Sequence, residues 1–273
     1  MTRLLLLLLL LLALPTLAAP PQRIVSLSPH TSEMAAALGL EGQLVAVSDY
    51  SNYPPSLSKL PSVAGYAGIQ VERVLAHQPD LVLAWKGGNP PAALAQLAAL
   101  GAPLFYSDPH TPEQLLDELL ALGRLTERQP QAEALVASLR QRLARLDQTY
   151  GNRPPRPLFY QLWSQPLMTS GSSGWLQPLL ARCSAKSVFD DLATPYPQVD
   201  AEMVLARDPP LIIIGDGDPD YWQRWPALQA VRQQRVVPLS PDLLQRMGPR
   251  IVDGLEQLCA TVWPELETTE SKP

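Results

Sequence analysis

Segments with strand character alternate with helical segments through the first half of the chain, and this alternation restricts the fold more than any other feature. Residues 23–27 (RIVSL) are β-branched and apolar, break at Pro29, and lead into an alanine-rich helical segment that ends at Gly39. The pattern recurs with strands expected at residues 44–47, 81–84 and 103–106, and helices at 71–77, 90–100 and 112–122. Such alternation predicts a mainly parallel sheet with helices on both faces.

A longer helix separates the two halves of the chain. Apolar residues recur at helical spacing over residues 131–150, and the proline-rich segment 152–157 (NRPPRP) follows. Further strands are expected at residues 158–162, 211–214 and 236–239, with a closing helix at about 249–262. We therefore predict an α/β protein of two lobes, each a mainly parallel β-sheet flanked by helices, joined by one long rigid helix. The expected division is a signal peptide at 1–19, an N-terminal lobe at 20–126, the linking helix at 127–151, a C-terminal lobe at 152–266 and a flexible tail at 267–273.

The two halves share a local sequence pattern. ERVLAHQPDL at residues 72–81 and EMVLARDPPL at residues 202–211 both fit E-x-V-L-A-x-x-P-x-L, in which proline stops a short helix before a buried strand. The repeat favours two lobes of related design, with convergence on the same local pattern as the alternative.

Aromatic residues gather in the loops next to the expected strands. They are Tyr50, Tyr53, Tyr66, Trp85, Trp163, Trp175, Tyr196, Tyr221 and Trp222. In open α/β sheets ligands bind beyond the carboxyl ends of the strands, so aromatic side chains there in both lobes predict a ligand cleft between the lobes.

The amino terminus has the features of a secretory leader. Arg3 precedes nine consecutive leucines, and Ala18 and Ala19 are small residues of the kind found at cleavage sites. The apolar run is too short to span a membrane, so we expect a cleaved signal peptide and an exported protein. In an oxidising compartment Cys183 and Cys259 are expected to be paired, with two separate buried thiols as the alternative.

Charge and composition exclude several classes of function. The formal net charge is −5 with 21 lysines and arginines among 273 residues, so the chain lacks the positive charge of a nucleic-acid-binding protein. The three histidines have no metal-ligand spacing, and no lysine follows the segment 171–174 (GSSG), which is expected to begin a helix. A G-x-S-x-G nucleophile motif is absent, whereas a carboxylate pair for hydrolysis would leave no local signature. We therefore expect no catalysis, no metal and no cofactor; a secreted hydrolase is the least favoured alternative.

Five segments and three polar residues carry a family resemblance. The segments are residues 23–39 (RIVSLSPHTSEMAAALG), 49–55 (DYSNYPP), 72–85 (ERVLAHQPDLVLAW), 84–89 (AWKGGN) and 195–199 (PYPQV), and the residues are Asp242, Arg246 and Arg250. Together they resemble the periplasmic substrate-binding proteins of ABC importers for cobalamin, iron siderophores and haem, and in particular the cobalamin-binding members. The resemblance covers nearly the whole mature sequence and also places a disulfide between Cys183 and Cys259.

The resemblance implies a function and its partners. It implies a periplasmic protein, monomeric when free, that captures cobalamin (vitamin B12) in the cleft and delivers it to a two-fold symmetric membrane permease of an ABC importer. A siderophore- or haem-binding protein of the same fold is the alternative, in which Arg246 and Arg250 would hold an anionic chelate.

Individual roles follow from the same resemblance. Glu72 and Glu202, at equivalent points of the repeat, would each dock onto arginines of one permease subunit. The cobalamin-binding members carry tryptophan where this chain has Tyr66 and Tyr196, and phenylalanine where it has Met168. Asp242 and Arg246 are four residues apart, which on one helical turn gives either a surface ion pair or a polar clamp at the cleft rim. The residues implied to line the corrin pocket are Tyr50, Tyr66, Trp85, Met168, Tyr196, Asp242 and Arg246.

Overall fold

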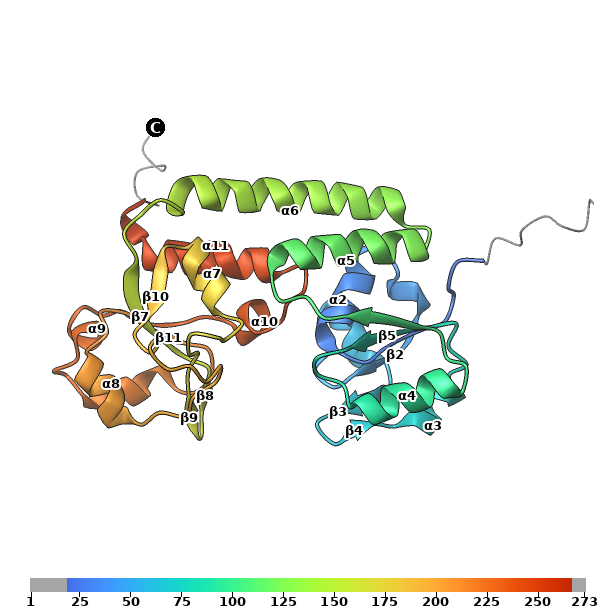
Figure 1. Cartoon of the computed structure of the whole chain (residues 1–273), viewed down its shortest axis with the longest axis horizontal. Coiled ribbons are helices and arrows are strands. Elements are labelled where there is room, and N and C mark those ends of the chain that lie inside the picture. Colours follow the sequence, from blue (N-terminus) through green and yellow to red (C-terminus); the bar gives the residue numbers. More distant parts are fainter. Residues whose placement is uncertain (1–18, 267–273) are drawn as a thin grey trace, which may run out of the picture.

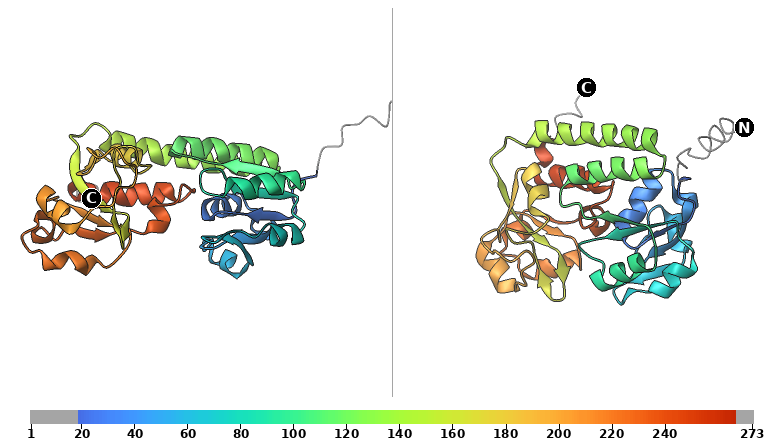
Figure 2. Two further views of the ribbon diagram at one scale, coloured as in Figure 1. Left: turned by 60° about the horizontal axis from the view of Figure 1, so that its bottom comes forward. Right: turned by 45° about the vertical axis from the view of Figure 1, so that its right-hand side comes forward.

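Two lobes joined by a long helix make up the protein. The structure is a computed structural model that describes residues 19–266, so the predicted signal peptide (except Ala19) and the predicted tail lie outside the described residues. Helix α6 (Gln129–Tyr150) runs along one edge of the molecule and spans both lobes (Figures 1 and 2). The helix begins at Gln129, with Arg128 as its N-cap, two residues before the helical pattern begins in the sequence.

The N-terminal lobe contains a six-stranded sheet with the strand order β4-β3-β2-β1-β5-β6. All neighbouring strands are parallel except β3 and β4, which form an antiparallel hairpin. The strands are β1 (Ile24–Ser26), β2 (Leu44–Ser48), β3 (Ser62–Gly65), β4 (Gly68–Ile69), β5 (Leu81–Trp85) and β6 (Leu104–Ser107). The helices are α2 (Pro29–Ala37), α3 (Val71–Ala76), α4 (Pro91–Ala99) and α5 (Pro112–Leu125), with 3-10 turns η1 (Glu41–Gln43) and η2 (Pro55–Lys59).

The C-terminal lobe contains a four-stranded parallel sheet with the order β10-β7-β11-β12 and a separate hairpin of β8 and β9. The strands are β7 (Arg156–Gln161), β8 (Trp163–Ser164), β9 (Leu167–Met168), β10 (Ala185–Ser187), β11 (Ile212–Ile214) and β12 (Val236–Pro238). The helices are α7 (Gln177–Arg182), α8 (Ala201–Arg207), α9 (Gln229–Arg232), α10 (Pro241–Leu244) and α11 (Ile251–Val262), with the 3-10 turn η3 (Pro219–Arg224). The predicted two-lobe α/β fold with mainly parallel sheets is thus confirmed.

The largest hydrophobic core passes from one lobe to the other beneath α6. Successive strand residues point to opposite faces, so Ile24 joins the core shared with α2 and α5, whereas Val25 joins a separate cluster with α3 and α4. In the C-terminal lobe Ile213 joins the shared core, and Ile212 packs on the opposite face of the sheet. The two lobes are therefore linked by the packing of this shared core as well as by the covalent chain.

Close approach of helices fixes α6 against the N-terminal lobe. A Cβ atom at Gly123 of α5 would lie 2.4 Å from the Cβ of Ala132 on α6, so the two helices touch where neither carries a larger side chain. Burial of Val136, Leu139 and Leu143 extends this contact along α6. The helix is therefore packed along its length, which limits independent motion of the lobes.

The C-terminal lobe contains a disulfide and an irregular segment before α7. Cys183, at the end of α7, forms a disulfide with Cys259 of α11, as predicted. The segment 171–174 does not begin a helix, which is a correction. Its backbone N–H groups bond instead to a neighbouring loop, from Gly171 to the carbonyl of Pro195 and from Ser172 to that of Leu192, so α7 begins only at Gln177.

Candidate ligand-binding site

Three aromatic residues predicted to line the cleft are exposed on loops and strand ends of the N-terminal lobe. Tyr50 follows β2 with a backbone φ of 62° and is 77% exposed. Tyr66 lies in the turn of the β3–β4 hairpin and is fully exposed, and Trp85, the last residue of β5, is 40% exposed. Large aromatic side chains that are exposed to solvent are typical of a ligand-binding surface.

The loop after β5 holds Trp85 in a defined position. The Asn89 side chain accepts a hydrogen bond from the backbone N–H of Trp85 (2.7 Å) and donates one to the carbonyl of Leu27 (2.9 Å). A Cβ atom at Gly88 would lie 2.1 Å from the Trp85 ring, so the indole rests directly on this glycine. The buried ring of His30 also meets the indole edge-on, with 5.6 Å between the ring centroids. The indole is thus fixed by the fold before any ligand binds.

An aromatic recess of about 370 Å³ occupies the C-terminal lobe beside the β8–β9 hairpin. It contains Met168 and Tyr196, both predicted to line the pocket, and burial raises the pKa of the Tyr196 hydroxyl. Trp163 and Trp175 also line it, although only the clustering of aromatics beside strands pointed to them. Its lining residues are Leu162, Trp163, Pro166, Met168, Trp175, Tyr196 and Gln245. The β8–β9 hairpin, which carries Trp163, and the β3–β4 hairpin, which carries Tyr66, lie on the sides of the two lobes that face each other (Figure 1).

Asp242 and Arg246 form a polar group that reaches across to the other lobe. Arg246 pairs with Asp242 (2.7 Å) and donates a hydrogen bond to the Asn52 side chain (2.7 Å), whose amide nitrogen donates to Asp242 (3.0 Å). Glu33, on α2, also pairs with Arg246 (3.4 Å) and with Arg250 (2.6 Å). The ion pair that the Asp242–Arg246 spacing indicated is present, and it is part of a larger network between the lobes. Glu33 and Asn52 were not identified from the sequence, since no local pattern connects them to residues about 200 positions away.

Two aromatics expected at the cleft lie elsewhere. Trp222 is fully buried in the C-terminal core, where its indole N–H donates to the Gln161 side chain (2.9 Å). Tyr221 packs edge-on against Trp222 and Trp225. Their place after a strand was a correct prediction, but the 3-10 turn η3 directs them against the sheet and away from the cleft.

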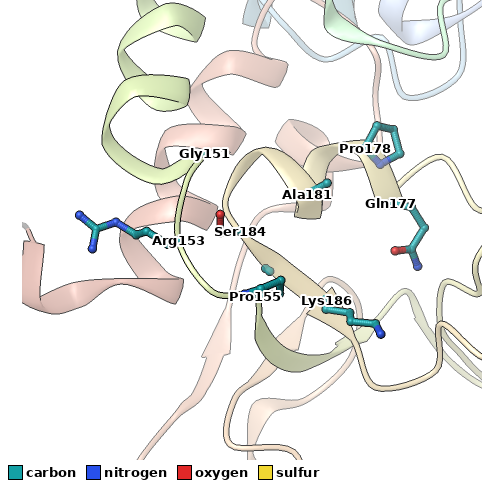
Figure 3. A pocket seen from close by; sticks show the side chains of 9 residues that line it. Gly151, Arg153, Pro155, Gln177, Pro178, Ala181, Ser184 and Lys186 are labelled. Carbon is teal, nitrogen blue, oxygen red and sulfur yellow. The ribbon is translucent and has the colours of Figure 1, made fainter.

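A second recess of about 510 Å³ lies at the junction of α6, α7 and β10. Figure 3 shows Gln177 and Pro178 on α7, Lys186 on β10, and Arg153 pointing away from the others. Lys186 is paired with Asp190 (2.8 Å). With no aromatic residue and no unpaired charge directed inward, this recess is a poorer ligand site than the smaller aromatic one.

The two glutamates of the internal repeat are equivalently placed. Glu72 lies in the first turn of α3 and Glu202 in the first turn of α8, and both are exposed. The two helices lie on the edge of the molecule opposite α6 (Figure 1). Each carboxylate is therefore available to a partner that covers this edge.

Among residues 19–266 no group of three or more His, Cys, Asp or Glu residues could hold a metal ion. None of the described helices combines the length and the hydropathy needed to cross a membrane.

Comparison with known proteins identifies relatives over nearly the whole chain. A family model described as periplasmic binding protein matches residues 24–243. The vitamin B12-binding protein of Photorhabdus laumondii is 41% identical over 250 residues, covering 89% of each chain. That of Yersinia pestis is 41% identical over 255 residues, covering 90% of this chain and 87% of the relative.

Solved structures give the same picture. The crystal structure of the periplasmic vitamin B12 binding protein of Vibrio cholerae superposes with a TM-score of 0.83 at 36% identity, covering 93% of this chain and all of that one. A periplasmic heme binding protein from Pseudomonas aeruginosa superposes with a TM-score of 0.77 at 29% identity, covering 89% and 93%.

Proposed function

The chain belongs to the periplasmic binding protein family, and from this premise we propose that it captures cobalamin (vitamin B12) between its lobes and delivers it to an ABC importer. The family consists of substrate-binding proteins and not of enzymes, which supports a periplasmic protein that carries a transported ligand and needs no cofactor. Catalysis is no part of the proposed function.

Exposed aromatic residues on the facing sides of both lobes are the observation that carries the proposal. A corrin is a large disc with apolar faces and an edge of amide side chains. Trp85 and Tyr50 on one lobe and Trp163 and Tyr196 on the other offer apolar walls for such faces. Tyr66, Met168, Asp242 and Arg246 complete the proposed binding set.

The charge of the site favours cobalamin over an anionic chelate. Arg246 and Arg250 were the arginines available for a siderophore or for the propionates of haem. Both are already paired with carboxylates, Arg246 with Asp242 and Glu33, and Arg250 with Glu33. A ligand without strong negative charge fits this neutralised set better.

Titration calorimetry with cobalamin tests the proposal. We expect one molecule bound per protein, unaffected by chelators, and a protein that stays red after desalting. A W85A variant should bind at least about tenfold more weakly, because burying a large apolar side chain contributes roughly 1.5–3 kcal/mol. Competition with a ferric siderophore and with haem identifies the preferred ligand; preference for either, or no binding of any corrinoid, would contradict the proposal.

We further propose that Glu72 and Glu202 dock the loaded protein onto the two subunits of a two-fold symmetric permease. A carboxylate in the first turn of a helix commonly interacts only with the helix dipole. Equivalent exposure of both, on the same edge of two related lobes, suits a symmetric partner that carries positive charge.

A further inference from the structure

Glu33 is a buried carboxylate that joins the two lobes. It lies on α2 of the N-terminal lobe, and its side chain is 3% exposed. Arg250 of the C-terminal lobe donates to it twice, from Nε to Oε2 (3.0 Å) and from Nη2 to Oε1 (2.6 Å). This bidentate geometry is the stronger kind of arginine–carboxylate contact. Arg246 approaches the same carboxylate at 3.4 Å.

The positive and negative charges in this network are balanced. Two guanidinium groups, of Arg246 and Arg250, face two carboxylates, of Glu33 and Asp242. The pKa of Arg250 is raised because its guanidinium donates hydrogen bonds to Glu33. That guanidinium also lies over the ring of Tyr53, 3.8 Å from its centroid. Arg250 has no other carboxylate within salt-bridge distance among the described residues, so Glu33 supplies its charge partner.

The network borders the proposed ligand site. Gln245, next to Arg246, lines the aromatic recess, and Asn52, which bonds to Arg246, lies two residues from Tyr50. Arg246 and Arg250 keep 13% and 18% of their side chains exposed. A bound molecule between the lobes would therefore experience whatever net charge these arginines retain.

We propose that Glu33 is a specificity-determining residue that excludes anionic chelates by neutralising Arg246 and Arg250. The inference rests on the proposed function, because it explains how a scaffold shared with haem-binding relatives selects a ligand without strong negative charge. Loss of one carboxylate would leave one uncompensated positive charge in a partly buried site, where charge interactions are stronger than in water. Selectivity of this kind comes from disfavouring the competitor as well as from fitting the correct ligand.

The E33Q variant tests the inference, since glutamine keeps the shape and removes the charge. Affinities of wild type and E33Q are measured by fluorescence quenching for two anionic probes, a ferric tris-catecholate complex and haem. We expect E33Q to bind the tris-catecholate complex on the order of tenfold more tightly than wild type, with a smaller gain for haem, which carries less charge. The double variant E33Q/R250M restores the charge balance and should lose the gain.

Matched variants separate this effect from general damage. E256Q alters a glutamate that pairs with Arg142 on the α6–α11 contact, away from the aromatic residues, and should leave chelate binding unchanged. D242N removes the other carboxylate of the network, so it should also raise chelate affinity, and it decides the question if E33Q fails to fold. Unchanged chelate affinity in the folded variants, or a gain that persists in E33Q/R250M, overturns the inference. Binding of cobalamin to wild type is measured separately, so failure of the proposed function is distinguishable from failure of this inference.

Discussion

His30 is a buried residue whose ring contacts Trp85 of the proposed site. Its Nδ1 lies 3.0 Å from the Ser28 hydroxyl and its Nε2 lies 3.0 Å from the Ser107 hydroxyl, while its ring contacts Trp85. Both ring nitrogens therefore have partners that a neutral imidazole satisfies. Burial lowers the pKa of His30 to about 4, although the nearby Asp108 opposes the shift.

This pKa predicts that the protein loses stability in mild acid. The unfolded chain takes up a proton at His30 near pH 6.5, whereas the folded protein does so only near pH 4, so stability falls as the pH drops through this window. We expect the free energy of unfolding to fall by about 2 kcal/mol between pH 7 and pH 5 through this residue. Urea denaturation of wild type and H30Q at both pH values separates the effect of His30 from that of the nearby Glu118, whose pKa is raised by burial. H110Q, at an exposed histidine, should behave as wild type; an equal acid loss in H30Q would contradict the prediction.

At the residue scale, the sequence predicts several exposed aromatic residues beside strands but not the polar contacts that join the lobes. Tyr50, Trp85 and Tyr196 follow from their place beside strands and from the family resemblance. Trp222 fits the same local pattern but is buried, because the direction of a side chain in a loop depends on tertiary packing. Glu33 left no signal, since its partners lie 213 and 217 residues away.

At the scale of elements, the disulfide joins helix α11 to the connection between α7 and β10. Cys183 directly follows α7 and precedes β10, whereas Cys259 lies near the end of α11. Both side chains are fully buried in the shared core. The bond therefore closes a long loop that contains most of the C-terminal lobe.

Removing this bond should destabilise the C-terminal lobe. Opening a loop of 76 residues costs about 4 kcal/mol in the chain-entropy description. The C183A/C259A variant should therefore unfold at a clearly lower urea concentration, as followed by circular dichroism. Treatment with a reductant should lower the midpoint of wild type in the same way and leave the variant unchanged. Equal midpoints of wild type and variant without reductant would refute the prediction.

Regular elements could be predicted from periodicity, and irregular ones could not. The strands β5 and β11 and the helix α6 match their apolar patterns to within one or two residues. The β8–β9 hairpin has two residues in each strand, too few for any alternation to be recognised. The hairpin carries Trp163 and Met168, so part of the recess lies on an element that periodicity could not predict.

At the scale of the whole molecule, the lobes are connected by more than one structure. Helix α6 packs along both, the shared core passes beneath it, and Arg142 of α6 pairs with Asp253 and Glu256 of α11. The Glu33 network joins the lobes a second time at the cleft. Large hinge closure would require these contacts to break, so we expect the proposed site to be largely preformed.

The proposed docking role of Glu72 and Glu202 can be tested separately from ligand binding. Cobalamin affinity of the E72A/E202A variant should equal that of wild type, because both glutamates lie on helices apart from the aromatic residues. Uptake by proteoliposomes that contain the cognate importer should fall by on the order of tenfold or more, since opposed charges at an interface are lost. E133A, at an exposed glutamate of α6, is the matched control and should support normal uptake. Normal uptake with E72A/E202A would show that neither glutamate docks the protein.

The position of the second cysteine also orders the events of assembly. Cys259 lies 76 residues after Cys183, on helix α11, which contributes to the core shared by both lobes. Cys183 therefore has no native partner until α11 has emerged, and a chain shortened before α11 would carry Cys183 as a thiol without that partner. Maturation of the C-terminal lobe thereby depends on the arrival of α11.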